Sequence, residues 1–293
     1  MNLPDPVVQL SGAVEVASEV LVVPNSGAGL VPNIGVIGGR EAVLVVDTGL
    51  GLVNASAVRE FAAEFARGRR VHLTTTHFHP EHAFGASAFS GAYLVNSAQA
   101  ADLRRKGSGY LEMFRGFGGH VAERLADVVL PVPDEVYDGV RALDLGGRTV
   151  LLRPTGRGHT LGDQVVEVPD AGVLFTGDLA ETGQFAIFPW FPPHDTDVSG
   201  VAWIGVLDAL IAASPQIVVP GHGSVGDVGV LQGVQTYLHE LRDETWRRRD
   251  SAMAVDEIEA EVREVLLARH PSWTGREWIS PGVRCLCSDF SVD

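Results

Sequence analysis

The sequence predicts an α/β protein in which two sheets pack face to face between layers of helix. Short apolar, β-branched runs recur early in the chain, and most of them end at Gly, Pro or Asp, as strands in a meander do. Later in the chain, segments with helical spacing alternate with further strands. Two halves each run from a group of strands to a helix, which predicts layers of helix around sheet packed on sheet.

The first third of the chain carries most of the short runs. Residues 53–67 differ from them, because Phe61 and Phe65 recur at helical spacing and define one apolar face. We therefore expect a helix there. The runs themselves predict strands at residues 7–10, 14–16, 20–23, 34–37, 42–47 and 71–76.

A looser pattern follows over residues 97–140. Five glycines between residues 107 and 119 interrupt a partly helical stretch, and glycine weakens helices. We expect an insertion here. It is either a lid over a cleft, carrying Tyr110, Phe114 and Phe117, or a plain surface excursion.

Strands and helices alternate in the second half. We expect one domain over residues 1–245, including the lid insertion at about 97–140, and a C-terminal helical extension over residues 246–293 packed on the same domain. The patterns predict strands at 149–152, 164–168, 173–176 and 217–219, and helices at 199–213, 229–248 and 255–269.

Composition and charge exclude some classes of partner. The 293 residues are 45% hydrophobic, so the chain can bury a sizeable core. Its formal net charge of −15 opposes binding to nucleic acid, which favours a basic face. The basic run at residues 247–249 is expected to be a solvated helix face. Nucleic acid is therefore not an expected partner; the partner that we expect is a small-molecule substrate.

The chain shows no pattern for export or membrane insertion. Its N-terminal segment has no basic region followed by an apolar one, and no uncharged apolar stretch approaches about 20 residues. Cys285 and Cys287 are too close to form an unstrained disulfide, and no second thiol pair exists to complete a C-x-C metal site. We expect a cytoplasmic protein.

Five of the ten histidines fall in three places, each at the end of a predicted strand. These places are the run HFHPEH at residues 77–82, the turn GRGHT around His159 and the turn PGHG around His222. A lone acid, Asp178, ends a further strand in the sequence FTGD. Because sites in α/β proteins form beyond the carboxyl ends of strands, we expect these side chains to meet.

The spacing of these residues indicates metal binding. Side chains alternate along extended chain, so His77 and His79 point to the same side, and a turn at Pro80 brings Glu81 and His82 round to face them. Imidazole and carboxylate suit zinc, and also iron or manganese. Five histidines would crowd one ion. Two ions sharing a carboxylate fit better, and Asp178 is the strand-end acid placed to bridge them. The candidate metal ligands are His77, His79, Glu81, His82, His159, Asp178 and His222.

The remaining histidines are expected to be structural or surface residues. His194 is the least certain of them, because it lies in a loop shortly after Asp178. The others are His72, His120, His239 and His270.

These residues resemble the metallo-β-lactamase superfamily of metallohydrolases over about residues 30–240. The signature of that family is H-x-H-x-D-H, followed by a later His, a bridging Asp after a strand and a final His. The resemblance implies a four-layer αββα sandwich. It also implies one metal site of His77, His79 and His159, a second site of Glu81, His82 and His222, a bridging Asp178, and an Asp47 that supports the histidine loop.

Glu81 departs from the family pattern, which usually has aspartate there. A glutamate reaches about 1.5 Å farther, so it either ligates the second ion from a displaced backbone or acts as a proton acceptor. We expect Glu81 and Asp178 to be the catalytic residues, orienting the nucleophile.

The resemblance implies a metal-dependent hydrolase, with two zinc ions as the expected cofactors, that attacks a carbonyl with a metal-bound hydroxide. The aromatic segment at residues 183–194 is expected either to line an apolar pocket or to pack on the sheet. We favour a carboxyl ester, lactone or thioester as substrate. The alternatives are a β-lactam hydrolase, an iron-dependent oxidoreductase on the same fold, and a non-catalytic scaffold. The Trp273–Trp278 region is expected to form a homodimer contact or to cover the sheet edge.

Overall fold

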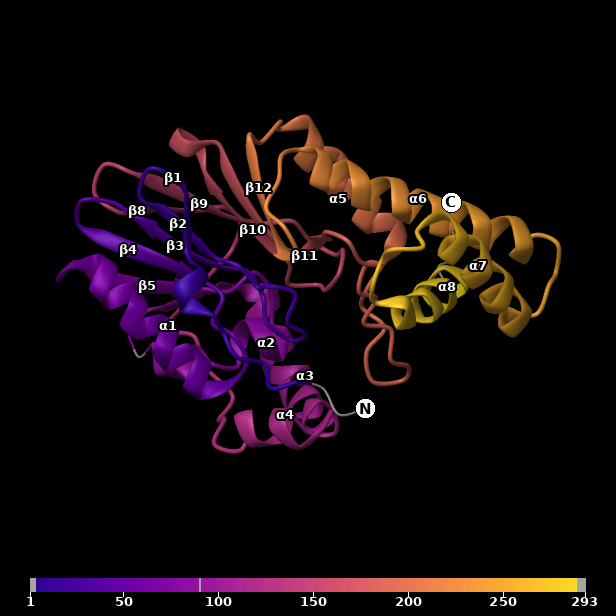
Figure 1. Cartoon of the computed structure of the whole chain (residues 1–293), viewed down its shortest axis with the longest axis horizontal. Coiled ribbons are helices and arrows are strands. Elements are labelled where there is room, and N and C mark those ends of the chain that lie inside the picture. Colours follow the sequence, from indigo (N-terminus) through magenta and orange to yellow (C-terminus); the bar gives the residue numbers. More distant parts are fainter. Residues whose placement is uncertain (1–3, 90, 289–293) are drawn as a thin grey trace.

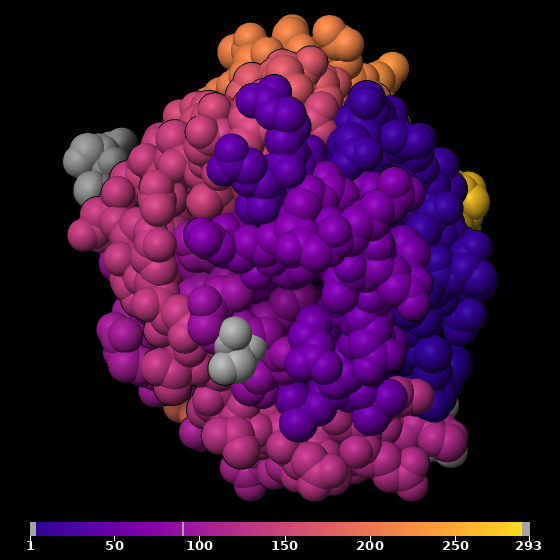
Figure 2. Space-filling model, turned by 90° about the vertical axis from the view of Figure 1, so that its left-hand side faces the viewer, coloured from indigo at the N-terminus to yellow at the C-terminus, as the bar shows by residue number. Residues whose placement is uncertain are grey.

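The computed structural model describes residues 4–89 and 91–288, which form helix, sheet, sheet and helix layers (Figure 1). The first sheet has seven strands in sequential order, and the second has five strands in the order β12-β11-β10-β9-β8. The predicted fold class, an α/β four-layer αββα sandwich, is confirmed. Figure 2 shows the face covered by the first half of the chain, with later segments visible at its rim.

The first half of the chain builds one sheet and the helices on its outer face. Strands β1 to β4 form an antiparallel meander, and β4 to β7 run parallel to one another. The elements are β1 (Val14–Ala17), β2 (Val20–Val23), β3 (Ile34–Gly38), β4 (Ala42–Val46), α1 (Gly51–Ala66), β5 (Arg70–Thr74), α2 (Pro80–Ala83), β6 (Tyr93–Asn96), α3 (Ser97–Arg115), α4 (Gly119–Arg124) and β7 (Glu135–Tyr137).

The second half builds the other sheet and its outer helices. Strands β8 to β11 pair antiparallel, and β11 pairs parallel with β12. The elements are β8 (Arg141–Asp144), β9 (Thr149–Pro154), β10 (Gln164–Val168), β11 (Val173–Glu181), α5 (Gly200–Ala212), β12 (Ile217–His222), α6 (Gly229–Arg249), α7 (Val255–Arg269) and α8 (Ile279–Ser288).

Apolar side chains from both sheets fill the space between them. Ile37 and Leu44 of the first sheet and Val166 and Phe175 of the second are almost fully buried in one cluster. The sheets approach closely at Gly35, where an added Cβ would lie 2.5 Å from the Phe175 ring. A side chain at position 35 would therefore push the two sheets apart.

The strand expected at residues 7–10 is absent, and this prediction is wrong. The amide of Val8 donates to the Asn54 side chain at 3.1 Å, and Asn54 donates to the Pro6 carbonyl at 2.7 Å. The backbone of this segment is therefore satisfied by a side chain of α1 rather than by a neighbouring strand.

Residues 97–115 form one continuous helix, α3, where we expected glycines to interrupt a partly helical stretch. The Asn96 side chain accepts a hydrogen bond from the Gln99 amide and caps the helix. Leu103, Tyr110 and Phe114 form its buried face. Gly107 lies close to Leu130, where an added Cβ would be 3.1 Å from the side chain. The glycine that we expected to break the helix instead lets it pack closely.

The C-terminal helices pack on the second sheet's outer face in one apolar cluster with α5. The expected domain boundary after residue 245 falls inside α6, which continues to Arg249. In the segment expected to form a dimer contact or to cover the sheet edge, the Trp273 ring stacks on His270 at 4.1 Å.

No helix among the described residues combines the length and the apolar character needed to cross a membrane.

Replacing Gly35 with alanine should destabilise the protein, because the new methyl group would collide with Phe175. We expect the free energy of unfolding to fall by about 1–3 kcal/mol in denaturant titrations. Gly205→Ala is the control, since the exposed position in α5 has open space for a Cβ and alanine favours helix. Equal stability of Gly35→Ala and the wild type would show that the sheets are not in fixed contact there.

Candidate metal centre

The histidine run takes its shape from a sharp turn after β5. His79 has extended backbone angles (φ −60°, ψ 151°), and Pro80 occupies the first turn of the short helix α2, a position that proline favours. The chain therefore passes from extended to helical between the H-x-H pair and the residues that follow. Glu81 and His82 turn back toward His77 and His79, as the sequence predicted.

All seven predicted ligands come together in two groups that share Asp178. Within each group the potential ligand atoms lie within 4.8 Å of one another. The first group consists of His77, His79, His159 and Asp178, and the second consists of Glu81, His82, Asp178 and His222. Every one of these side chains is at least nine-tenths buried.

In the first group, three imidazole nitrogens converge. His79 Nδ1 lies 3.0 Å from His77 Nε2 and 3.1 Å from His159 Nε2. Asp178 Oδ2 lies 3.8 Å from His77 Nε2 and 3.7 Å from His159 Nε2. A tetrahedral zinc ion with bonds of about 2.0–2.1 Å separates its ligand atoms by about 3.3 Å, so these spacings are close to those of a zinc site.

The second group converges on the other carboxylate oxygen. Asp178 Oδ1 lies 3.3 Å from His82 Nε2 and 3.5 Å from His222 Nε2. Glu81 Oε2, His82 Nε2, His222 Nε2 and both Asp178 oxygens are buried without a hydrogen bond to any described residue. Buried polar atoms normally have partners. Metal ions would supply the missing partners in both groups, so the residues fit a binuclear centre.

Other side chains and backbone groups orient these ligands. Asp47 accepts hydrogen bonds from His82 Nδ1 at 2.9 Å and from the Thr76 hydroxyl at 3.0 Å. The Thr76 hydroxyl in turn lies 3.1 Å from His77 Nδ1. Asp47 therefore supports the histidine loop directly and through Thr76, the position that the resemblance implied. Such outer contacts fix imidazole rings for metal binding.

Burial sets the charge of most of the histidines. It lowers the pKa of His77 and His79 well below the ordinary value and that of His159 to about 4. It also lowers the pKa of His222. Neutral imidazoles carry the lone pair that a metal needs.

The carboxylates respond differently to the same burial. Burial opposes the charged form of Asp178, but the imidazoles of His82 and His222 hold its pKa well below the ordinary value. For His82, burial is outweighed by Asp178 and Asp47, which raise its pKa. Burial raises the pKa of Glu81 to about 7. The centre therefore combines Asp178, which is charged at neutral pH, with Glu81, whose pKa lies near neutral pH.

Glycines make room for the shared carboxylate. A Cβ added at Gly221 would lie 2.0 Å from Asp178 Oδ1. A Cβ at Gly177, whose φ is +54°, would lie 2.4 Å from the Thr76 hydroxyl. The glycines next to the ligands in sequence thus allow β5, β11 and β12 to approach closely at their ends.

Sequence reasoning missed Glu181, a buried acid three residues after Asp178. Its Oε1 accepts a hydrogen bond from the Ile187 amide at 3.3 Å, and the Ile187 carbonyl accepts from His159 Nδ1 at 2.9 Å. Burial raises the pKa of Glu181 well above the ordinary value. Its place three residues after Asp178 in the same strand is a signal that could have identified it.

The structure also places three other features that the sequence singled out. His194 is exposed, and its side chain belongs to neither group of ligands. Phe185 and Phe188 of the aromatic segment are fully buried in the core beside α5 and α6 rather than lining an open pocket. Cys285 and Cys287 form no disulfide and join no metal-ligand group within residues 4–89 and 91–288.

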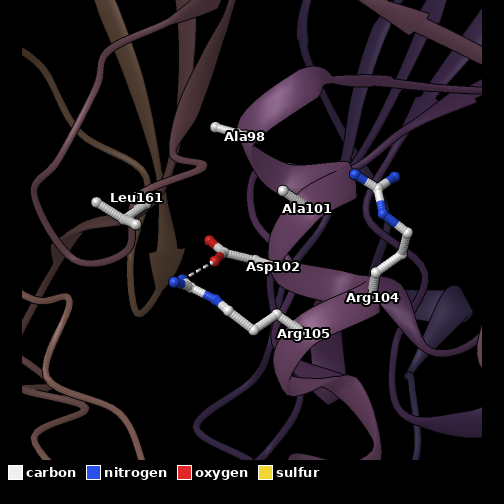
Figure 3. A pocket seen from close by; sticks show the side chains of 6 residues that line it. All are labelled: Ala98, Ala101, Asp102, Arg104, Arg105 and Leu161. Atoms are coloured by element: carbon white, nitrogen blue, oxygen red, sulfur yellow. Dashed lines mark hydrogen bonds and ion pairs between the residues drawn. The ribbon is translucent and has the colours of Figure 1, made fainter.

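A surface pocket of about 460 Å³ lies between α3 and the loop that carries His159 (Figure 3). Asp102 and Arg105 of α3 line it, with Arg105 Nη2 2.9 Å from Asp102 Oδ1, and Leu161 faces them from the loop. None of the seven candidate ligands lines it. It is therefore separate from the metal centre.

Two sheets between helix layers, with histidines and carboxylates gathered at their strand ends, define a sandwich of the metallohydrolase class. Comparison with family models gives the narrower assignment. Residues 27–222 match the model of the metallo-beta-lactamase superfamily, and the chain belongs to that superfamily.

Solved structures share this fold at low sequence identity. A metallo-beta-lactamase from Pontibacter korlensis is 19% identical with a TM-score of 0.61, covering 78% of this chain and 98% of that one. The DIM-1 metallo-beta-lactamase is 15% identical with a TM-score of 0.58, covering 82% and 98%. TMB-1 is 17% identical with a TM-score of 0.58, also covering 82% and 98%. Comparison with curated proteins gave no match.

Replacing Asp178 with alanine should lower metal binding in both groups, because each group uses one of its oxygens. We expect elemental mass spectrometry to show metal content reduced by more than half relative to the wild type. Asp208→Ala, at an exposed position in α5, should retain the wild-type content. Loss of only one ion, or no loss, would contradict the assignment of Asp178 as a ligand shared by both groups.

Proposed function

We propose that this chain is a binuclear zinc hydrolase that cleaves a small carboxyl ester, lactone or thioester. Its membership of the superfamily and its two ligand groups support metal-dependent hydrolysis. One observation carries the binuclear part of the proposal. The two oxygens of Asp178 face separate pairs of imidazole nitrogens at 3.3–3.8 Å.

The donor set favours zinc. Neutral imidazoles with carboxylates are typical zinc ligands, although iron and manganese accept the same donors. Zinc ions, when bound, lower the pKa of a coordinated water toward about 7 and polarise a substrate carbonyl. His77, His79 and His159 would hold one ion, Glu81, His82 and His222 the other, and Asp178 both.

We assign to Asp178 and Glu81 the tasks of orienting the attacking water and accepting its proton. Asp178 stays charged, because the imidazoles around it favour its carboxylate form. Glu81 Oε2 is buried and forms no hydrogen bond to a described residue, so it can complete the second group or accept a proton from the attacking water. Both carboxylates are buried, so the positive charge of the ions that they would hold would act strongly on a developing oxyanion.

Buried aromatic rings pack around the first group, and the small substrate is proposed on the superfamily and the charge. Phe78 and Tyr110 lie within 4.9 Å of the His79 ring, and Trp203 lies 5.6 Å from His159. The net charge of −15 disfavours a nucleic acid. In some di-iron proteins of this fold a glutamate replaces the second histidine of the H-x-H pair. This chain retains His79 there, which favours hydrolysis over iron-dependent redox chemistry.

The proposal can be tested on protein purified without added metal. We expect about two zinc ions per chain by elemental mass spectrometry and hydrolysis within a panel of aryl esters, lactones and thioesters. Chelation should abolish the activity and added zinc should restore it. His77→Ala should be inactive, whereas His120→Ala, at an exposed position in α4, should match the wild type.

Two outcomes would overturn this proposal in different ways. Iron with a visible absorption band would favour redox chemistry. Turnover of a chromogenic cephalosporin without turnover of the esters, lactones or thioesters would show that the substrate is a β-lactam. The proposed metal centre would then stand unchanged.

A further inference from the structure

One ligand of the first group is held differently from the other histidines. The outer nitrogens of His77, His82 and His159 lie against the Thr76 hydroxyl, the Asp47 carboxylate and the Ile187 carbonyl. His222 is hydrogen-bonded to the backbone of Val31. His79 turns Nδ1 toward the ligand group, and its outer atom, Nε2, is buried without a hydrogen bond to any described residue.

The His79 ring has no such hydrogen bond to orient it, but an aromatic ring packs against its face. The ring of Tyr110, from α3, stacks on His79 with centroids 4.9 Å apart and planes 22° apart. Phe78 meets the Tyr110 ring edge-on at 4.9 Å. Tyr110 is only 6% exposed. A near-parallel, buried ring restricts rotation of the imidazole much as a hydrogen bond would, because packed rings resist displacement.

Tyr110 is itself fixed at its other end. Its hydroxyl donates to Asp195 Oδ2 at 2.7 Å, and Lys106 Nζ donates to Asp195 Oδ1 at the same distance. Lys106 lies one helical turn before Tyr110, so both side chains leave the same face of α3. All three side chains are buried. A charged hydrogen bond in such surroundings is strong.

Asp195 also connects Tyr110 to the support of a second ligand. It lies in the segment after β11 that contains Ile187, whose carbonyl accepts from His159 Nδ1. This segment therefore holds two ligands of the first group, His159 through a carbonyl and His79 through Asp195 and Tyr110.

We propose that Tyr110 is a positioning residue that holds the His79 ring in its ligating orientation, and that Asp195 and Lys106 fix Tyr110 for this role. The inference rests on the proposed metal centre and concerns its first group. It gives Tyr110 a role different from both alternatives that the sequence left open for this segment, a lid and a plain surface excursion.

The test measures zinc affinity of the full chain by competition with a chromogenic chelator, together with the visible spectrum of the cobalt(II)-loaded protein. Tyr110→Leu should lower the affinity for one of the two zinc ions by about 10- to 100-fold, the usual effect of losing an outer contact to a metal ligand. It should also change the visible spectrum of the cobalt-loaded protein. Tyr110→Phe keeps the ring and loses the bond to Asp195, so its affinity should lie between those of Tyr110→Leu and the wild type.

Phe114→Leu is the matched control. It removes a buried ring from the same helix, next to Tyr110 and Phe117, and should leave zinc affinity and the cobalt spectrum unchanged. If Tyr110→Leu fails to fold by circular dichroism, the comparison of Tyr110→Phe with Phe114→Leu decides.

The outcomes separate this inference from the proposed function. Wild-type affinity and spectrum in the Tyr110 variants would overturn it, even if the wild type hydrolyses esters. An equal loss in Phe114→Leu would also overturn it, because the effect would then be general packing. Weakened metal binding in the Tyr110 variants of a protein that hydrolyses none of the panel would support it and reject the hydrolase assignment. A wild type that binds no metal would overturn both.

Discussion

The rest of the site depends on a carboxylate, that of Asp178, held inside the protein. Removing a charge from water costs several kcal/mol unless other groups compensate. Four imidazole nitrogens lie within 3.8 Å of this carboxylate, two for each oxygen, and metal ions held between these nitrogens and the carboxylate would provide that compensation. Gly221 must lack a side chain, because a Cβ would lie 2.0 Å from Asp178 Oδ1. The need to surround one buried charge thus determines residues in three other segments that are far apart in sequence: the histidine run after β5, the turn at His159 and the end of β12.

The two-sheet architecture makes this arrangement achievable. Strands β4 and β5 run parallel, as do β11 and β12, so each pair delivers its following residues to one edge. Asp47, after β4, adopts φ +66°, a strained conformation that costs on the order of 1–3 kcal/mol. Its hydrogen bonds to Thr76 and His82 offset this cost and connect the strain to the ligands.

The fold class and the gathering of the seven candidate ligands were predictable from the sequence, because the strand pattern, the strand-end histidines and the H-x-H-x-E-H run can be recognised without tertiary contacts. That the seven residues bind metal stays a prediction. Helix α3 was not, since burial of Tyr110 and Phe114 outweighs the helix-weakening effect of Gly107 and its neighbours. The absence of a strand at residues 7–10 depends on Asn54, more than 40 positions away. The positions of Glu181 and Tyr110 against the ligands likewise depend on how distant segments pack.

The central claim is that two metal ions share Asp178. Anomalous diffraction at the zinc absorption edge, from crystals of the zinc-loaded protein, tests it directly. The account predicts two peaks on either side of the Asp178 carboxylate, one among His77, His79 and His159 and the other among Glu81, His82 and His222. A single peak, or two peaks of which one is not in contact with Asp178, would contradict it.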